Sequence, residues 1–290
     1  MHTVTQVWQK AALVLKEFDS DTPVIDARLL LQQVLGITRE ELLLEPKRML
    51  SETEQQQFES LLERRLAHEP MSHIIGSREF YGLEFKVTPD VLTPRPDTET
   101  VVDTVLLQIT ENRRWKTSNP ASVIRILDLG TGTGCLLLSL LHALPNARGT
   151  GVDISPQALA VAQENAEKLG LADRAEFALS RWCEKISKNY DIIVANPPYI
   201  ASNAIAALMP DVADYEPHLA LDGGPDGLAA YRDIARQLRP HLAEQAIVVL
   251  EIGAGQERLV ADIFITEGFR LEAERSDLAG IPRCLVMTLT

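Results

Sequence analysis

From residue 123 onward, short apolar runs alternate with stretches whose apolar residues recur at helical spacing, and this alternation limits the fold most strongly. The apolar runs that read as strands are VIRILDL (123–129), RGTGVDI (148–154), AEFAL (175–179), YDIIVAN (190–196), AIVVLEIG (246–253), FRLEAERS (269–276) and RCLVMTL (283–289). Strands that alternate with helices along a chain form a mainly parallel sheet, which the helices cover on both faces. We therefore predict an α/β fold with a mainly parallel sheet of seven strands.

The residues 1–75 have helical patterns but no strand signal and no glycine-rich loop. Apolar residues recur at helical spacing through VTQVWQKAALVLKEF, and a second helical pattern ends at Gly36, a plausible C-cap. A third pattern begins with Ser51 and Glu54, which match a capping box. We expect a small helical bundle over residues 1–75.

The connection between the two parts contains a hairpin signal and a rigid turn. REFYGLEFKV alternates apolar and polar residues around a glycine, which is typical of a short hairpin. TPRPDTE follows as a proline-marked turn into a helix, and the stretch 112–122 reads as a loose connection. We predict three segments: the helical domain at 1–75, a β-hairpin linker at 76–93 and the α/β domain at 94–290.

Composition limits the cellular context and the partners. The chain has 290 residues, enough for two domains, and no apolar run approaches the ~18 residues of a membrane span. Three scattered cysteines (Cys135, Cys183 and Cys284) fit a reducing cytoplasm, and the six histidines show no metal spacing. With 28 basic and 41 acidic residues the formal charge is −13, which argues against broad contact with a phosphate backbone. We expect a cytoplasmic protein without a metal site, a membrane contact or a direct nucleic-acid partner.

A glycine-rich loop follows the first predicted strand of the α/β part. ILDLGTGTGC, residues 126–135, ends a buried strand near Asp128 and leads into an apolar helix. Glycine allows the backbone to approach a ligand closely, and open α/β sheets bind ligands at the carboxyl ends of their strands. The dinucleotide fingerprint needs its third glycine where this chain has Cys135. The D-x-G-x-G-x-G spacing instead favours S-adenosylmethionine (SAM) over NAD.

An acidic residue ends the next strand. Asp153 closes GTGVD about 20 residues beyond the glycine loop, where an acid can accept hydrogen bonds from both hydroxyls of a ribose. The alternative is a helix N-cap, and that role suits Ser155 better because Pro156 takes the first helical position. We interpret Asp153 as a ribose ligand.

The motif NPPY follows the fourth predicted strand and opens on the same sheet edge as the glycine loop. Its two prolines make a stiff turn that holds the flanking groups still. Asn196 offers a neutral carbonyl, Pro197 a backbone carbonyl without a competing donor, and Tyr199 a face for a planar group. Two such acceptors would fix the N–H groups of a planar amide or aromatic amine and direct its nitrogen at a methyl donor. The simpler interpretation is an ordinary strand-ending turn.

DLGTGTG, VDIS and NPPYI together resemble the class I SAM-dependent methyltransferases, whose sheet is Rossmann-like. EPMSHIIGSREFYGLEFKVTPDVLTPRPDTE, DYEPHLALDGGPDGL and RSDLAGIPRCLV narrow the resemblance to the release-factor glutamine methyltransferases of the PrmC/HemK type, over nearly the whole chain. The resemblance implies methyl transfer to the side-chain amide nitrogen of the glutamine in the Gly-Gly-Gln motif of class I peptide-chain release factors. It also implies that the helical domain helps to recognise this protein substrate.

The resemblance also implies roles for individual residues. It assigns a SAM-binding role to Gly130, Thr131, Gly132, Thr133, Gly134, Asp153, Trp182 and Asn196. It assigns the glutamine pocket to Asn196, Pro197, Pro198 and Tyr199, with Asn196, Pro197 and Tyr199 as the catalytic group. The chain departs from the family at Arg181, since the family often has an acid before the tryptophan that lies beside the adenine. Roles for Arg95, His73 and Glu251 stay open.

Three further functions share parts of this chemistry. An N6-adenine methyltransferase uses the same N/D-P-P-Y logic, because adenine also has a planar exocyclic amine. The acidic charge and the lack of a basic, aromatic-rich segment argue against it. A ribosomal-protein glutamine methyltransferase would use the same turn on a different protein. A SAM-binding regulator without turnover would not need the turn, so the intact NPPY argues against a regulator.

Overall fold

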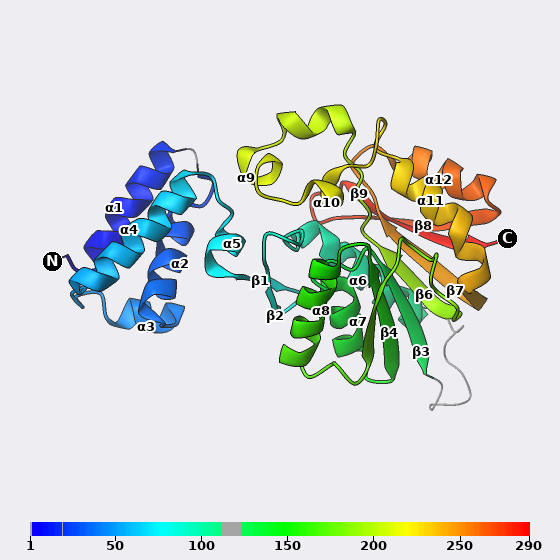
Figure 1. Ribbon diagram of the computed structural model, residues 1–290, viewed down its shortest axis with the longest axis horizontal. Helices are drawn as coiled ribbons and strands as arrows, with labels where there is room; N and C mark the ends of the chain where they lie inside the picture. The colour runs from blue at the N-terminus through cyan, green and yellow to red at the C-terminus, as the bar shows by residue number, and fades with distance from the viewer. Residues whose placement is uncertain (1, 19, 112–122) are drawn as a thin grey trace. The chain divides into compact units, whose positions relative to one another are not determined.

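The computed structural model describes residues 2–18, 20–111 and 123–290 (Figure 1). The chain divides into two compact units, Met1–Ser77 with Met209–Tyr215, and Arg78–Leu208 with Glu216–Thr290. The predicted loose connection at 112–122 lies outside the described residues. Among the described residues, no helix combines the length and the apolar character that crossing a bilayer requires.

The first unit is helical. Its helices are α1 (Val4–Glu17), α2 (Pro23–Leu35), α3 (Arg39–Leu44), α4 (Glu52–Leu66) and α5 (Met71–Ile75), with α9 (Pro210–Ala213) from later in the chain. The capping box of Ser51 and Glu54 is present, and Gly36 ends α2 in the left-handed conformation at φ 62°. The buried apolar residues between Val4 and Ile74 form a hydrophobic core of their own. The later segment is tied to this unit by the Tyr215 hydroxyl, which donates to the Ala67 carbonyl at 2.6 Å.

The hairpin predicted from REFYGLEFKV is present. It consists of β1 (Ser77–Phe80) and β2 (Leu83–Lys86). Its two-residue turn places Tyr81 at φ 52° and Gly82 at φ 74°, the pair of positive angles that a type I′ turn requires. The domain limits at 75 and 93 stay a prediction.

The second unit contains a sheet of seven strands in the order β5-β4-β3-β6-β7-β9-β8 (Figure 1). The strands are β3 (Ile124–Leu129), β4 (Ala147–Asp153), β5 (Ala175–Leu179), β6 (Tyr190–Ala195), β7 (Leu242–Glu251), β8 (Phe269–Ser276) and β9 (Pro282–Leu289). The first five strands in this order are parallel, and β9 pairs antiparallel with both β7 and β8. The predicted mainly parallel, Rossmann-like sheet of seven strands is therefore confirmed.

Helices cover both faces of this sheet (Figure 1). The regular helices of the unit are α6 (Glu99–Glu111), α7 (Cys135–Ala143), α8 (Pro156–Lys168), α10 (His218–Leu221), α11 (Ala229–Leu238) and α12 (Glu257–Thr266). Its short 3₁₀ turns are η1 (Pro96–Thr98), η3 (Ser202–Ala207) and η4 (Arg239–His241). Because strand side chains alternate, Leu127 and Leu129 pack with α11 and α12, whereas Ile126 packs with α6 and α7.

The strand order places the loops that carry the predicted site together. The chain runs outward from β3 through β4 to β5 and then crosses back to β6, which makes the β3–β6 boundary a topological switch point. Leu129 pairs with Val152 of β4 and with Ala195 of β6. The residues that follow these three, Gly130, Asp153 and Asn196, therefore emerge side by side at the carboxyl edge of the sheet.

Candidate active site

A pocket of about 500 Å³ lies at this edge of the sheet. Its walls include the segments 89–95, 130–133, 153–155 and 180–182, together with Asn196. The segments 130–133 and 180–182 and Asn196 directly follow β3, β5 and β6, and the segment 153–155 begins with the last residue of β4. The pocket is therefore located where open α/β sheets bind their ligands.

The glycine loop is held to the end of β4 through its main chain. The amides of Gly130 and Thr131 both donate to the Val152 carbonyl, at 2.8 and 2.9 Å. The Gly132 amide donates to Asp153 Oδ2 at 3.0 Å. Gly130 has φ 72°, and a Cβ there would lie 3.5 Å from the Trp182 ring, so the loop backbone and the indole lie against each other. The predicted cofactor residues Gly130 to Thr133 all line the pocket.

Gly134 differs from the other predicted loop residues because it is not among the residues that line the pocket. It is the N-cap of α7 at φ 80°, and a Cβ there would lie 3.1 Å from Leu138 and 3.3 Å from Ala162. The absence of a side chain at this position lets α7 pack closely against α8. Its cofactor role stays a prediction.

Asp153 lies at the pocket wall with both carboxylate oxygens already engaged by the main chain. Oδ2 accepts from the Gly132 amide, and Oδ1 accepts from the Ser155 amide at 2.9 Å. Burial raises the pKa of Asp153, and these amides oppose the shift. Ser155 caps α8 by accepting from Ala158, as predicted. The remaining lone pairs of Asp153 suit a pair of hydroxyl donors.

Replacement of Asp153 by alanine tests its predicted ribose role. We expect Asp153→Ala to weaken SAM binding by about 1.5–3 kcal/mol, because it removes hydrogen bonds to a charged group. Isothermal titration calorimetry measures the affinity, and the exposed Asp173→Ala is a control for the same change in net charge. Equal affinity in the Asp153→Ala variant and the wild type would contradict the assignment.

Asp128 also lines the pocket, although the sequence analysis gave it no role. Burial raises its pKa to about 7, although the Thr131 hydroxyl donates to Oδ2 at 2.6 Å. Its other oxygen, Oδ1, is buried and has no hydrogen-bond partner within the described part of the chain. Because a buried acceptor without a donor is costly, this oxygen suits a cationic ligand group such as the ammonium of SAM. The strand-end position of Asp128 was the available sequence signal.

Trp182 lines the pocket in an unusual backbone conformation, with φ 50°. The preceding residue, Arg181, forms an ion pair with Asp233 of α11 at 2.6 Å. Asp233 also lines the pocket, so the position before Trp182 has a base paired with an acid of α11 where the resemblance leads us to expect an acid. The adenine contact of Trp182 stays a prediction.

Two of the four residues of the NPPY turn line the pocket and two do not. Asn196 and Pro198 line the pocket, Pro197 is buried, and Tyr199 is not among the lining residues. The Asn196 amide nitrogen donates to Thr98 Oγ1 at 3.2 Å. Burial raises the pKa of Tyr199 to about 12, and the nearby Glu251 carboxylate adds to this. Tyr199 is therefore a neutral phenol at physiological pH, and its predicted contact with the substrate stays a prediction.

Two distant segments hold the backbone of this turn. The Gln256 side chain donates to the Tyr199 carbonyl at 3.0 Å and accepts from the Gly253 amide at 3.1 Å. Gly227 packs so closely that a Cβ there would lie 2.4 Å from the Tyr199 carbonyl oxygen. A Cβ added at Gly223 would lie 2.8 Å from the Pro198 carbonyl oxygen. The glycines of LDGGPDGL thus allow this loop to lie directly on the turn.

A methyl group at Gly227 should disturb this packing. We expect Gly227→Ala to lower the free energy of unfolding by about 1–3 kcal/mol and to reduce activity, because φ 74° is strained and the clash is with backbone. Gly170→Ala is the matched control, since Gly170 has φ 68° and no atom within 4 Å of its Cβ position. Urea unfolding and methyl transfer measure the two effects. Equal behaviour of the two variants would show that the close packing is unimportant.

Arg95 and His73, whose roles the sequence left open, lie in different units. Arg95 lines the pocket and forms an ion pair with Glu216 at 3.1 Å. Glu216 is buried and also accepts from the Thr93 amide at 3.1 Å, so it fixes the segment 93–95. His73 is buried in α5 of the helical unit.

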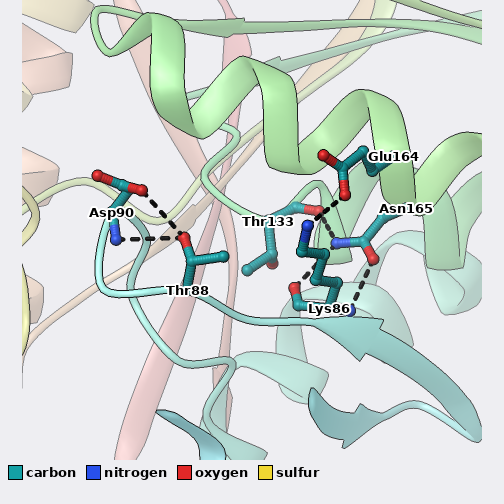
Figure 2. Close-up of polar contacts among 6 residues, drawn as sticks. All are labelled: Lys86, Thr88, Asp90, Thr133, Glu164 and Asn165. Carbon is teal, nitrogen blue, oxygen red and sulfur yellow. Dashed lines mark hydrogen bonds and ion pairs between the residues drawn. The ribbon is translucent and has the colours of Figure 1, made fainter. Parts of the chain in front are cut away.

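Asn165 of α8 joins the pocket wall to the glycine loop (Figure 2). Its Oδ1 accepts from the Lys86 amide at 2.7 Å. Its Nδ2 donates to the Lys86 carbonyl at 3.1 Å and to the Thr133 carbonyl at 2.9 Å. Asn165 is fully buried, and the segment 87–91 that follows packs on the same helix. Sequence reasoning missed this residue because its partners are distant along the chain.

Comparison with known proteins identifies relatives of this chain. Residues 6–76 match the family model of the PrmC N-terminal domain, and residues 121–243 match a methyltransferase domain model. The release factor glutamine methyltransferase of Agrobacterium fabrum is 43% identical over 91% of this chain and 89% of its own length. The protein of the same name from Caulobacter vibrioides is 42% identical over 92% of this chain and 89% of its own length.

The solved structure of the hMettl16 catalytic domain in complex with MAT2A 3′UTR hairpin 6 has a TM-score of 0.57. The similarity covers 79% of this chain and 82% of the hMettl16 chain. At 15% sequence identity it shows only that the two proteins share a fold. The fold and the pocket define a class I SAM-dependent methyltransferase. The identity to the named relatives is more specific, and the chain belongs to the release factor glutamine methyltransferase family.

Proposed function

We propose that this enzyme transfers a methyl group from SAM to the side-chain amide nitrogen (N5) of the glutamine in the Gly-Gly-Gln motif of class I release factors, and thereby modulates translation termination. The observation that carries this proposal is the setting of Asn196. Its amide nitrogen donates to Thr98, which leaves its carbonyl oxygen for an N–H donor in the pocket. The family membership supports the same substrate.

SAM is the methyl donor, and when bound it supplies a methyl group activated by a positively charged sulfur. The residues present suit this group, because Asp128 and Asp153 place carboxyl groups at the pocket wall and Asp128 Oδ1 lacks a donor among the described residues. In our proposal Asp153 holds the ribose and the glycine loop lies along the ligand. Trp182 provides a flat apolar surface for the adenine.

The substrate side of the mechanism is positioning. Asn196 Oδ1 and the Pro197 carbonyl each accept one N–H of the glutamine amide, which orients the nitrogen toward the methyl group. As the nitrogen gains positive charge, these fixed dipoles stabilise it more than they stabilise the neutral amide. Pro198 and Tyr199 complete the glutamine pocket in this proposal.

The helical domain, residues 1–75, would recognise the body of the protein substrate. This part has its own hydrophobic core, and the predicted cofactor residues all belong to the other unit. A cytoplasmic location and the absence of a direct nucleic-acid partner belong to the same proposal. They rest on the three free cysteines and on the formal charge of −13.

Mass spectrometry of a purified class I release factor, after incubation with labelled SAM and this enzyme, tests the proposal. We expect one added methyl group on the glutamine of the Gly-Gly-Gln motif. A release factor in which that glutamine is replaced by glutamate is the control and should stay unmodified. Methylation of a ribosomal-protein glutamine or of adenine, with the release factor unmodified, would overturn the proposal.

A further inference from the structure

The sheet register places Glu251 beside Asn196. Ala195 of β6 pairs with Leu250 of β7, so the next residues, Asn196 and Glu251, adjoin at the ends of two parallel strands. Val194 and Val249 pack toward α6, on the face opposite to Ala195 and Leu250. Since side chains alternate along a strand, Asn196 and Glu251 follow the face that α6 covers.

Thr98 comes from the turn that leads into α6 and meets both residues. Its Oγ1 accepts from the Asn196 amide nitrogen at 3.2 Å. Burial raises the pKa of the Glu251 carboxyl group, while Thr98, the charge of Arg283 and the side chain of Asn196 each oppose this rise, so Thr98 and Asn196 both lie close to that group. The bond to Thr98 fixes which end of the Asn196 amide is its nitrogen, and the ionised form of Glu251, which accepts hydrogen bonds but donates none, suits that nitrogen.

A glutamate is an unusual residue at so buried a position as 251. It is 2% exposed, and burial raises its pKa to about 7. Its Oε2 is buried without a hydrogen-bond partner, and no ion pair includes it, among the described residues. The nearby cation, Arg283, is held instead by Asp97 at 2.9 Å and Asp277 at 3.1 Å. A buried carboxylate without a counterion destabilises a fold, so packing alone does not account for it.

The backbone of Glu251 is also fixed. The buried Tyr231 hydroxyl donates to the Glu251 carbonyl at 2.9 Å. With its main chain held by Tyr231 and its side chain enclosed, the carboxylate is a rigid acceptor. A rigid acceptor can impose one orientation on a neighbouring amide group.

We propose that Glu251 and Thr98 are positioning residues that bind the amide nitrogen of Asn196 and so present its carbonyl oxygen to the substrate amide. The inference rests on the proposed function and adds the source of the orientation of Asn196. Without these two acceptors the Asn196 amide has two orientations of similar energy. In one of these orientations the NH₂ group of Asn196 faces the N–H groups of the substrate amide, so two donors oppose each other.

Substitutions that keep the shape of the side chain test this inference. We expect Glu251→Gln, which replaces one of the two acceptor oxygens by an NH₂ donor and removes the negative charge, to lower kcat about tenfold or more, with the SAM dissociation constant within about twofold of wild type. Thr98→Val should lower kcat similarly, whereas Thr98→Ser keeps the hydroxyl and should restore wild-type kcat. Thr104→Val, at a buried hydroxyl that donates within α6, is the matched control with normal kcat.

A double-mutant cycle decides whether Glu251 acts through Asn196. In the Asn196→Ala background, Glu251→Gln should have no further effect on kcat, because no amide is left to orient. An equal loss in both backgrounds would overturn the inference, as would wild-type kcat in Glu251→Gln or low kcat in Thr98→Ser. A parallel loss of SAM affinity would show a merely structural role and would also overturn it.

Failure of this inference can be distinguished from failure of the proposed function. If wild-type enzyme does not methylate a release factor, the proposed function fails whatever the variants do. The same variants would then be measured on the glutamine or adenine substrate that the wild type does methylate. Coupling between Asn196 and Glu251 on that substrate would support the inference, and independent effects would overturn it.

Discussion

Asn196→Ala should reduce kcat for methyl transfer to a release factor on the order of a hundredfold or more, while the fold is retained. The substitution removes the carbonyl oxygen that we propose to orient the glutamine amide. If Asn196 acts mainly in the transition state, kcat and kcat/KM should fall together. Stability should change little, because Asn196 lies at the end of β6 and the two prolines keep the turn.

The measurement is methyl transfer at saturating SAM, with circular dichroism to verify folding. Asn203→Ala, at an exposed asparagine in the following 3₁₀ turn η3, is the matched control and should keep wild-type kcat. Asn196→Asp keeps an acceptor but adds charge beside Glu251, so we expect low activity there as well. A folded Asn196→Ala enzyme with wild-type turnover would mean that the turn has no catalytic role.

Removal of residues 1–75 should reduce methylation of an intact release factor about a hundredfold or more, because the anchor residues of a protein interface carry several kcal/mol. The affinity for SAM should stay near the wild-type value, since every residue that lines the pocket lies after residue 75. A free Gly-Gly-Gln peptide is the control substrate, and both enzymes should methylate it at similar rates. Methylation of the whole release factor at the wild-type rate by the shortened enzyme would contradict a recognition role.

The segment 209–215 needs a control of its own in that experiment. It packs in the helical unit, and the shortened enzyme loses the hydrogen bond from Tyr215 to Ala67. Tyr215→Phe removes this bond in the full chain and measures its share of the effect. We expect Tyr215→Phe to keep most of the activity, because a single hydrogen bond contributes only about 1 kcal/mol.

Local signals predicted much of the fold. The capping box of Ser51 and Glu54 and the C-cap at Gly36 depend on residues within one helical turn, so the sequence displays them directly. The proximity of Asp153 and Asn196 to the glycine loop followed from a general rule, because the carboxyl ends of parallel strands lie at one edge of a sheet.

The supports of the site could not be predicted in this way. Gln256 is hydrogen-bonded to Tyr199, which is 57 positions away in the sequence, and Asn165 is hydrogen-bonded to Lys86, which is 79 positions away. Arg181 pairs with Asp233 of α11, which lies 52 positions later in the chain. No periodicity or short motif encodes such pairs, because they depend on how whole elements pack.

The Asn165 contacts have a consequence for how the pocket opens. One side chain satisfies backbone groups at the end of the hairpin and in the glycine loop, so separating either partner breaks hydrogen bonds shared with the other. Wall and loop should therefore open as a single cooperative unit, and amide hydrogen exchange at Lys86 should report that opening. The replacement of spent cofactor by fresh cofactor would then depend on the rate of this shared opening. A ligand bound at the glycine loop would slow amide hydrogen exchange in the hairpin.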